Sequence, residues 1–135
     1  MITLTKDMLV GVTKIDTQHE ELINRLNTVV SMGIEAVSKE ETQKTLDLLG
    51  EYVIKHFTDE EALQRQGNYP KYEWHRGQHQ SYIAEINKLK SEFAANGHSP
   101  KFMLDMNKSI IQWIVRHIKS ADVELGKYLS GRLAK

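Results

Sequence analysis

The sequence predicts an all-α protein: an up-down-up-down four-helix bundle with an N-terminal extended arm and a short C-terminal helix. Three observations support this fold class. Apolar residues recur three and four positions apart over long stretches, which is typical of helices that bury one face. Only two prolines, Pro70 and Pro100, interrupt the 135 residues, and strand-like alternation is hard to find. The stretches between the periodic segments are short, which favours antiparallel neighbours.

The elements are expected to follow one another within a single domain, residues 1–135. They are an arm over 1–15, helices at about 17–37, 39–66, 70–95 and 100–120, and a short helix at about 122–133. Thr17 with Glu20 has the spacing of a capping box, which predicts the start of the first helix. Ser38 with Glu41 repeats this spacing and predicts the start of the second.

Proline and glycine mark the later helix boundaries. Pro70 suits the first turn of the third helix, and Gly97 suits its end. Ser99 and Pro100 form an N-cap and first-position pair for the fourth helix. The apolar spacing predicts that the buried seam of this fourth helix consists of Met103, Met106, Ile110, Trp113 and His117.

Composition excludes several classes of function. Hydrophobic residues make up 40%, which argues against both a disordered chain and a membrane protein. The 18 basic and 18 acidic residues balance and are scattered, which argues against nucleic acid or an anionic membrane as a partner. Because there are no cysteines, disulfides, thiolate metal sites and iron–sulfur clusters are excluded. The first residues lack a signal-peptide pattern, so a cytoplasmic location is expected.

Six ionisable residues interrupt the apolar seams, where bundle helices normally carry apolar side chains. They are His19, His56, Glu60, His75, His79 and His117. A single seam histidine is more often an ordinary core residue than a ligand. These six, however, lie at the start of the first helix, the end of the second, the start of the third and the end of the fourth. In an up-down-up-down bundle those four regions share one end, so all six are expected in one layer of the core.

Such a layer is costly without a ligand. Each buried polar group without a partner costs roughly 1–3 kcal/mol. A metal satisfies imidazoles and carboxylates together, and the pairs His56/Glu60 and His75/His79 each lie one turn apart on a single helix face. The donors exceed what one tetrahedral zinc ion uses, so the sequence predicts two metal ions that share bridging carboxylates.

At this point the residues resemble a known family. The motifs are Ile15-Asp16-Thr17-Gln18-His19, His56-Phe57-Thr58-Asp59-Glu60-Glu61, Tyr69-Pro70 followed by His75 and His79, and His117-Ile118 followed by Asp122. They are similar to those of the hemerythrins, and most similar to the bacterial single-domain branch. The resemblance runs from about Val10 to Leu129, and all seven ligand positions of the family are filled at its spacings.

The resemblance implies two non-haem iron ions bridged by Glu60, Asp122 and an oxo or hydroxo group. It implies that His75, His79 and His117 bind one iron, whereas His19 and His56 bind the other and leave one position open for dioxygen. Asp122 enters the ligand set only through this resemblance. It lies five residues after His117, roughly 140° away on a regular helix, so the helix must end or bulge near Ser120.

The implied function is reversible dioxygen binding for storage, delivery or sensing, and not enzymatic catalysis. The alternative is a di-iron enzyme that acts on peroxide or nitric oxide. By resemblance, Leu22, Phe57 and Trp113 line an apolar dioxygen pocket, although ordinary core packing explains them equally well. The sequence indicates no protein partner. His98 is expected in a surface loop away from the metal, and Asp16 is expected either to cap a helix or to orient a ligand.

Overall fold

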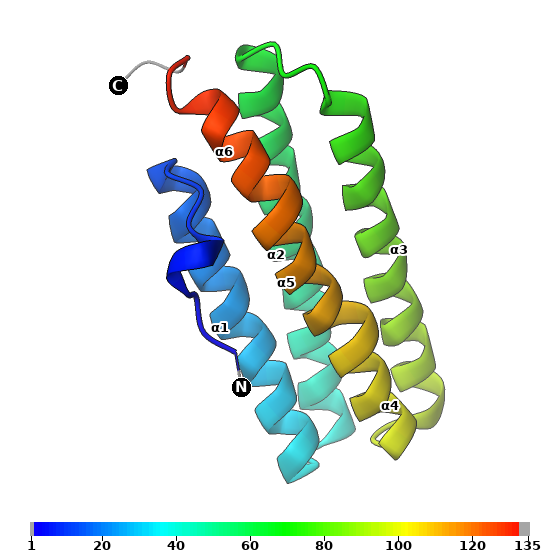
Figure 1. Cartoon of the computed structure of the whole chain (residues 1–135). Coiled ribbons are helices and arrows are strands. Elements are labelled where there is room, and N and C mark those ends of the chain that lie inside the picture. Colours follow the sequence, from blue (N-terminus) through cyan, green and yellow to red (C-terminus); the bar gives the residue numbers. More distant parts are fainter. Residues whose placement is uncertain (1, 133–135) are drawn as a thin grey trace.

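Long antiparallel helices make up the computed structural model, which describes residues 2–132 (Figure 1). The elements are η1 (Lys6–Met8), α1 (Thr13–Glu35), α2 (Lys39–Gln66), α3 (Tyr72–Asn96), α4 (Pro100–Asp105), η2 (Met106–Gln112), α5 (Trp113–His117), η3 (Ile118–Asp122) and α6 (Val123–Leu129). The last five form one continuous helical run, the fourth helix of the bundle. The predicted all-α, up-down-up-down class is therefore confirmed. Met1 and residues 133–135, which include the ends of the expected arm and last helix, lie outside the described residues.

Side-chain caps and a glycine set several helix ends. The Ser38 hydroxyl accepts the Glu41 N–H at 3.1 Å, and the Ser99 hydroxyl accepts the Phe102 N–H at 3.0 Å. Each satisfies a backbone donor that the first turn of a helix leaves without a partner. Gly97 ends α3 with a φ of +65°, a conformation that glycine adopts without strain. These three boundaries agree with the sequence prediction.

The first helix begins earlier than predicted, because Asp16 and not Thr17 organises its start. The carboxylate of Asp16 accepts the N–H groups of Val10 and Gly11 at 2.8 and 3.2 Å, so it holds the arm against the first turn. The α1 helix therefore starts at Thr13, and Thr17 lies inside it. Asp16 fixes the arm and does not hydrogen-bond a histidine. Similarly, α3 begins at Tyr72 and not at Pro70, which lies in a turn closed by Tyr72 N–H and Tyr69 C=O at 3.2 Å.

The arm packs along α1 instead of projecting into solvent. The Ile2 N–H donates to Asn27 Oδ1 at 3.0 Å, and Asn27 Nδ2 donates to the Ile2 carbonyl at 2.7 Å. Between Ile2 and α1, the short 3₁₀ turn η1 inserts Met8 into the core at 1% exposure. The arm thus closes one side of the bundle.

The fourth helix buries Met106, Ile110 and His117 as predicted, but the rest of its buried face differs from the predicted seam. Its inward side chains follow one another at steps of four: Phe102, Met106, Ile110, Ile114, Ile118 and Asp122. Met103 and Trp113 are only partly buried. Four residues turn a regular α-helix by about 400°, so this spacing would drift by about 40° at every step. The π-helical segments η2 and η3 each widen a turn and absorb much of that drift. The expected separate helix at 122–133 is accordingly the continuation α6.

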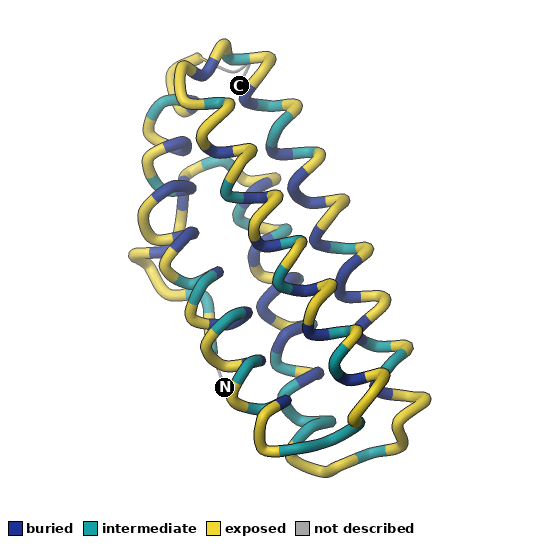
Figure 2. Tube along the Cα trace, turned by 90° about the vertical axis from the view of Figure 1, so that its right-hand side faces the viewer, coloured by how far each residue is buried: buried dark blue, intermediate teal, exposed yellow. Residues whose placement is uncertain are grey.

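Two apolar clusters lie on either side of the polar layer. Buried segments face the interior of the bundle along its whole length (Figure 2). The larger cluster fills the bundle from the loops that join α1 to α2 and α3 to α4 as far as Leu22, Phe57 and Ile118. The smaller cluster, around Ile15 and Leu125, fills the opposite end. The predicted ligand positions fall between them along the helices. Within residues 2–132, no helix combines the length and apolar character needed to cross a bilayer.

His98 lies in the loop between α3 and α4, away from the other histidines as predicted, but it is partly buried and ties this loop to the one between α1 and α2. Its Nε2–H donates to the Val37 carbonyl at 2.8 Å, with Thr42 Oγ1 at 3.2 Å. The ring packs edge-on against Phe93, with the centroids 5.0 Å apart. The sequence places His98 between Gly97 and Ser99, where its reach to the preceding loop leaves no periodic signal.

Replacing His98 with alanine is expected to lower stability without changing metal content. The variant His98→Ala leaves the Val37 carbonyl without its donor, a loss of about 1–2 kcal/mol in the free energy of unfolding. Urea unfolding and a metal assay of the same preparation check this. Asn96→Ala, at an exposed position two residues earlier, serves as the control. A loss of metal from His98→Ala would contradict the purely structural role.

Candidate metal centre

Seven ionisable side chains from all four helices of the bundle meet in one buried layer. They are His19 on α1, His56 and Glu60 on α2, His75 and His79 on α3, His117 on α5, and Asp122 at the end of η3. None is more than 3% exposed. The structure therefore brings together every residue that the sequence and the family resemblance nominate as a ligand, in a layer closed to solvent.

Glu60 stands at the centre of this layer and faces four histidines. Its Oε1 lies 3.1 Å from both His75 Nε2 and His79 Nε2. Its Oε2 lies 3.4 Å from His56 Nε2 and 3.7 Å from His19 Nε2. The two oxygens of one carboxylate therefore serve two different groups of imidazoles.

The two oxygens of the Asp122 carboxylate, on the fourth helix, also face different histidines. Its Oδ1 lies 2.8 Å from His75 Nε2 and 3.0 Å from His117 Nε2, and its Oδ2 lies 3.1 Å from His19 Nε2. The layer thus has two unequal halves. One half has three imidazoles, the other has two, and both carboxylates place one oxygen in each half.

A bulge in the fourth helix brings Asp122 into the layer. On a regular α-helix a residue five positions after His117 points roughly 140° away from it. The segment η3 is π-helical, and a π turn returns to the same face after about five residues. Between the two alternatives that the sequence leaves open, a break or a bulge, the structure has the bulge.

Charges in the layer pair with one another when no metal is bound. Burial opposes ionisation of Glu60, but the surrounding histidines, His19 first, hold its pKa well below the usual value. Asp122 behaves in the same way, its pKa being lowered mainly by His117 and His19 against burial and the Glu60 charge. Burial alone would lower the pKa of His19, but the carboxylates of Asp122 and Glu60 have the larger combined effect and raise this pKa to about 10. The same carboxylates raise the pKa of His75 to about 9.

The donor set fits a pair of cations. Both Glu60 oxygens and the Nε2 atoms of His19, His56 and His79 are buried and have no well-formed hydrogen bond within the described residues. Ligand atoms gather in two overlapping groups, each with its atoms within 4.8 Å of one another. One group is Glu60, His75, His79, His117 and Asp122; the other is His19, His56 and Glu60. Cations would satisfy these atoms together, which protein hydrogen bonds do not.

Three histidines are oriented by a side chain from a neighbouring helix. The Nδ1–H of His56 donates to Gln18 Oε1 at 2.7 Å. Likewise, His79 Nδ1–H donates to Glu61 Oε2 at 2.8 Å, and His117 Nδ1–H donates to Gln78 Oε1 at 2.7 Å. These acceptors keep the proton on Nδ1, so the Nε2 lone pairs face the centre. This is the arrangement that metal-binding histidines need.

Sequence reasoning missed these three acceptors. Gln18, Glu61 and Gln78 lie beside the seams and not on them, so periodicity does not select them. A signal was nevertheless present, because each is adjacent in sequence to a seam ligand: Gln18 to His19, Glu61 to Glu60 and Gln78 to His79. A residue beside the seam reaches the ligand of the next helix, here α1 to α2, α2 to α3 and α3 to α5.

Replacing Glu61 is expected to weaken metal binding without removing it. Loss of such an outer acceptor typically lowers metal affinity 10- to 100-fold. The variant Glu61→Leu should show this loss, whereas Glu61→Gln keeps an acceptor oxygen and should show a smaller one. Competition with a chelator of known affinity measures both. Equal affinities for Glu61→Leu and the unmodified chain would show that His79 does not depend on this contact.

Two of the three predicted pocket residues, Phe57 and Trp113, stack on imidazoles of the layer. The Phe57 ring stacks on His79, with centroids 3.7 Å apart and planes within 2°. Trp113 stacks on His117 at 4.9 Å and 17°, and Leu22 is fully buried in the larger cluster. Phe57 and Trp113 both contact Tyr82, at centroid distances of 6.0 and 4.6 Å. Apolar walls thus stand against two of the imidazoles, and their role as a dioxygen pocket stays a prediction.

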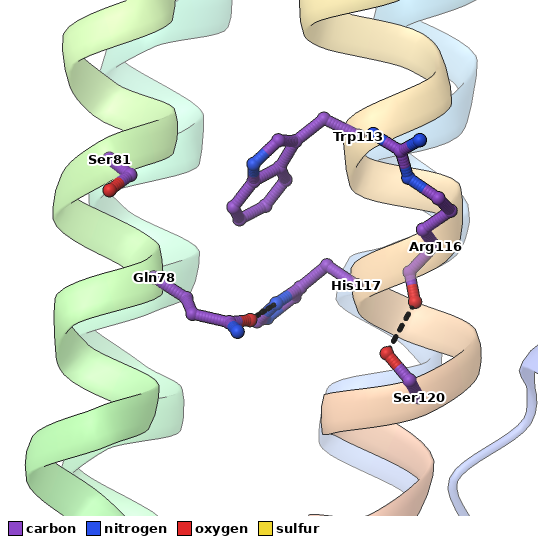
Figure 3. A pocket seen from close by; sticks show the side chains of 6 residues that line it. All are labelled: Gln78, Ser81, Trp113, Arg116, His117 and Ser120. Atoms are coloured by element: carbon purple, nitrogen blue, oxygen red, sulfur yellow. Dashed lines mark hydrogen bonds between the residues drawn. The ribbon is translucent and has the colours of Figure 1, made fainter.

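A surface cavity reaches the outer edge of this layer. Its volume is about 360 Å³, and it lies between α3 and the fourth helix (Figure 3). The side chains that line it are Gln78, Ser81, Trp113, Arg116, His117 and Ser120. Figure 3 shows the Gln78 amide facing the His117 ring, with Trp113 beside it. His117 therefore forms part of the cavity wall, together with Gln78 and Trp113, which both contact its ring.

Comparisons with known proteins agree with the fold and the layer. Residues 10–129 match the model of the hemerythrin HHE cation binding domain. Bacteriohemerythrin of Methylococcus capsulatus is 27% identical over 118 residues, 85% of this chain and 86% of that protein. Hemerythrin subunit alpha of Lingula anatina is 29% identical over 80% of this chain and 78% of its own length. A crystal structure of wild-type hemerythrin shares the fold, with a TM-score of 0.85, 24% identity, and coverage of 96% of this chain and 98% of that one. The chain therefore belongs to the hemerythrin family.

Proposed function

We propose that this protein binds dioxygen reversibly at a non-haem di-iron centre, for oxygen storage, delivery or sensing. The observation that carries the proposal is the unequal division of the buried layer. Three histidines face one oxygen of each carboxylate, and only two histidines face the other oxygens. Membership of the hemerythrin family supports iron as the metal and dioxygen as the ligand.

The donor atoms divide into a set of five and a set of four. His75, His79 and His117, with Glu60 Oε1 and Asp122 Oδ1, would hold one iron. His19 and His56, with the other oxygen of each carboxylate, would hold the second. A mixed shell of imidazole and carboxylate suits iron. Two ferrous ions joined by an oxo or hydroxo bridge would supply the electrons and the single open coordination position that dioxygen binding needs.

The protein itself supplies orientation, charge balance and exclusion of water. The carboxylates of Glu60 and Asp122 offset part of the positive charge of two cations. Gln18, Glu61 and Gln78 keep the imidazoles in the binding tautomer. Phe57 and Trp113 cover two ligands with aromatic rings, which restricts access of water and protons. Restricting protons favours release of intact dioxygen over its reduction.

An iron assay and optical spectra of the same sample test the proposal. About two irons per chain are expected, with a spectral change when the reduced protein meets air that reverses when oxygen is removed. Iron well below two per chain, or no reversible change, would contradict the proposal. Stopped-flow mixing with peroxide or nitric oxide adds a second test, because rapid multiple turnover would favour an enzyme.

A further inference from the structure

Two of the five histidines in the layer differ from the others in their outer contacts. His56, His79 and His117 each donate from Nδ1 to a side chain of a neighbouring helix. The Nδ1 atoms of His19 and His75 are equally buried, but within residues 2–132 they have no hydrogen-bond partner. Metal-binding histidines almost always donate their second ring N–H. Some acceptor for these two rings is therefore expected.

Two further buried polar side chains, Gln64 and Tyr69, have no hydrogen-bond partner within the described residues, and Tyr69 lies beside His75. Gln64 follows Glu60 by one helical turn, and its side chain is fully buried. Neither its amide oxygen nor its amide nitrogen has a hydrogen bond within the described residues, and the same is true of the Tyr69 hydroxyl. The Tyr69 ring lies 6.3 Å from the His75 ring, and the Tyr69 N–H donates to the Gln64 carbonyl at 2.9 Å. Tyr69 thus contacts the backbone of Gln64 on one side and lies beside the ring of His75 on the other.

The position of Tyr69 relates this group to the centre. Tyr69 belongs to the smaller apolar cluster, with Ile15 and Leu125, which lies on this side of the layer. His75 Nε2 faces the two carboxylates of the layer, so its Nδ1, across the ring, points away from them.

None of these side-chain atoms pairs with another within residues 2–132. With a cation on Nε2, His75 must carry its proton on Nδ1 and can only donate there. The Gln64 amide and the Tyr69 hydroxyl can each both donate and accept. A water molecule accepts two hydrogen bonds and donates two, and buried waters typically bind to polar atoms of this kind.

We propose that a buried water molecule, held by the Gln64 amide and the Tyr69 hydroxyl, accepts the Nδ1–H of His75. Gln64 and Tyr69 are then positioning residues that act on the metal through His75, as Gln18, Glu61 and Gln78 act through the other histidines. The inference rests on the proposed function only in taking His75 as a metal ligand. It adds a bound solvent molecule and two residues that the seven-ligand centre does not require.

Nitrogen-resolved NMR of histidine rings tests this in protein loaded with zinc, which is diamagnetic. The unmodified chain should show a slowly exchanging His75 Nδ1–H with a magnetisation transfer to long-lived water. In Gln64→Met this signal should shift and exchange at least tenfold faster, and Tyr69→Phe should act in the same direction. The Nδ1–H signals of His56 and His117, which have protein acceptors, should stay in place. Gln66→Met, at an exposed site on the same helix, is the matched control.

Thermal unfolding of Gln64→Met distinguishes a bound water from an amide that has no partner. If the Gln64 amide has no partner, Gln64→Met removes an uncompensated polar group and should raise the melting temperature by roughly 3–10 °C. That rise, with an unchanged His75 signal, would overturn the inference. If the water is present, the melting temperature of the zinc-loaded variant should fall. Zinc well below two per chain would overturn the centre itself, whereas full zinc with no effect on His75 overturns only the bound water.

Discussion

Glu60→Ala is expected to lower the metal content from about two ions to less than one per chain and to abolish the reversible optical change. The reason is the position of Glu60, which places one oxygen in each half of the layer and faces four of the five imidazoles. Without it, Asp122 is the one carboxylate left to bridge the two halves, and each half loses a donor atom. In the metal-free protein the same change removes one of the two buried carboxylates that balance the protonated histidines, a loss of about 3–5 kcal/mol in the free energy of unfolding.

Metal analysis and denaturant unfolding of the purified variant measure both effects. Glu51→Ala changes the same residue type on the same helix at an exposed position, so it controls for general effects of the substitution. Glu60→Gln adds a second comparison, because it retains the shape and one donor oxygen but loses the charge. A Glu60→Ala protein that still holds two ions per chain would show that Asp122 alone is a sufficient bridge.

Removal of the metal is expected to lower the melting temperature, and to do so more strongly as pH rises. Metal at a hundred times its Kd contributes about 2.7 kcal/mol, or roughly 10 °C for a domain of this size. The pH dependence arises because protons and cations compete for the same imidazoles. In the metal-free protein, protonated histidines replace the cations as partners of Glu60 and Asp122.

The pKa shifts of these groups determine how the stability of the metal-free protein changes with pH. His19 and His75 have pKa values raised from 6.5 to about 10 and about 9. Their contribution to the free energy of unfolding is therefore complete below pH 6.5 and is lost as pH rises through 9 to 10. Glu60 and Asp122 have lowered pKa values, so their contribution to the free energy of unfolding is present above about pH 4 and is lost in acid. The metal-free protein should therefore be most stable between about pH 5 and 6.5. Metal binding strengthens with pH, so the two forms should diverge between pH 6 and 9.

Differential scanning calorimetry of loaded and chelated protein at several pH values provides the measurement. The gap in melting temperature should be small at pH 6 and largest near pH 9. A chelated protein as stable as the loaded one across this range would mean that the histidines and carboxylates satisfy one another without metal. Such a result would count against a resident metal centre.

Six of the seven candidate ligands are predictable from the sequence because they sit on helical seams where ionisable residues are rare. His19 and Glu60, for example, stand out as soon as the apolar period is written down. Asp122 is not predictable in this way, because its place depends on a π turn that the apolar spacing does not specify. The family resemblance supplied it, and the structure shows the backbone geometry that makes it possible.

The residues that orient the ligands cannot be predicted from the apolar spacing, for a different reason. Gln18 and Gln78 act across a helix–helix contact, so their partners depend on the rotation of two helices and not on spacing along one. Gln64 gives no signal of its own in the sequence, because a step of three from Glu60 leads to the apolar Leu63, whereas the buried position is the one at a step of four. The Asp16 contact to the arm likewise depends on where the chain before the helix turns back.

The two π segments make α5 a separately oriented part of the fourth helix. Each segment carries about one residue more than a regular helix of the same turns, and α5, with Trp113 and His117, lies between them. Deleting one residue from η2 would restore regular winding there and rotate everything on one side by about 100° relative to the other. Insertions and deletions in this helix are therefore constrained by the centre itself. Changes of length should be tolerated in the interhelical loops and rejected between Met106 and Asp122.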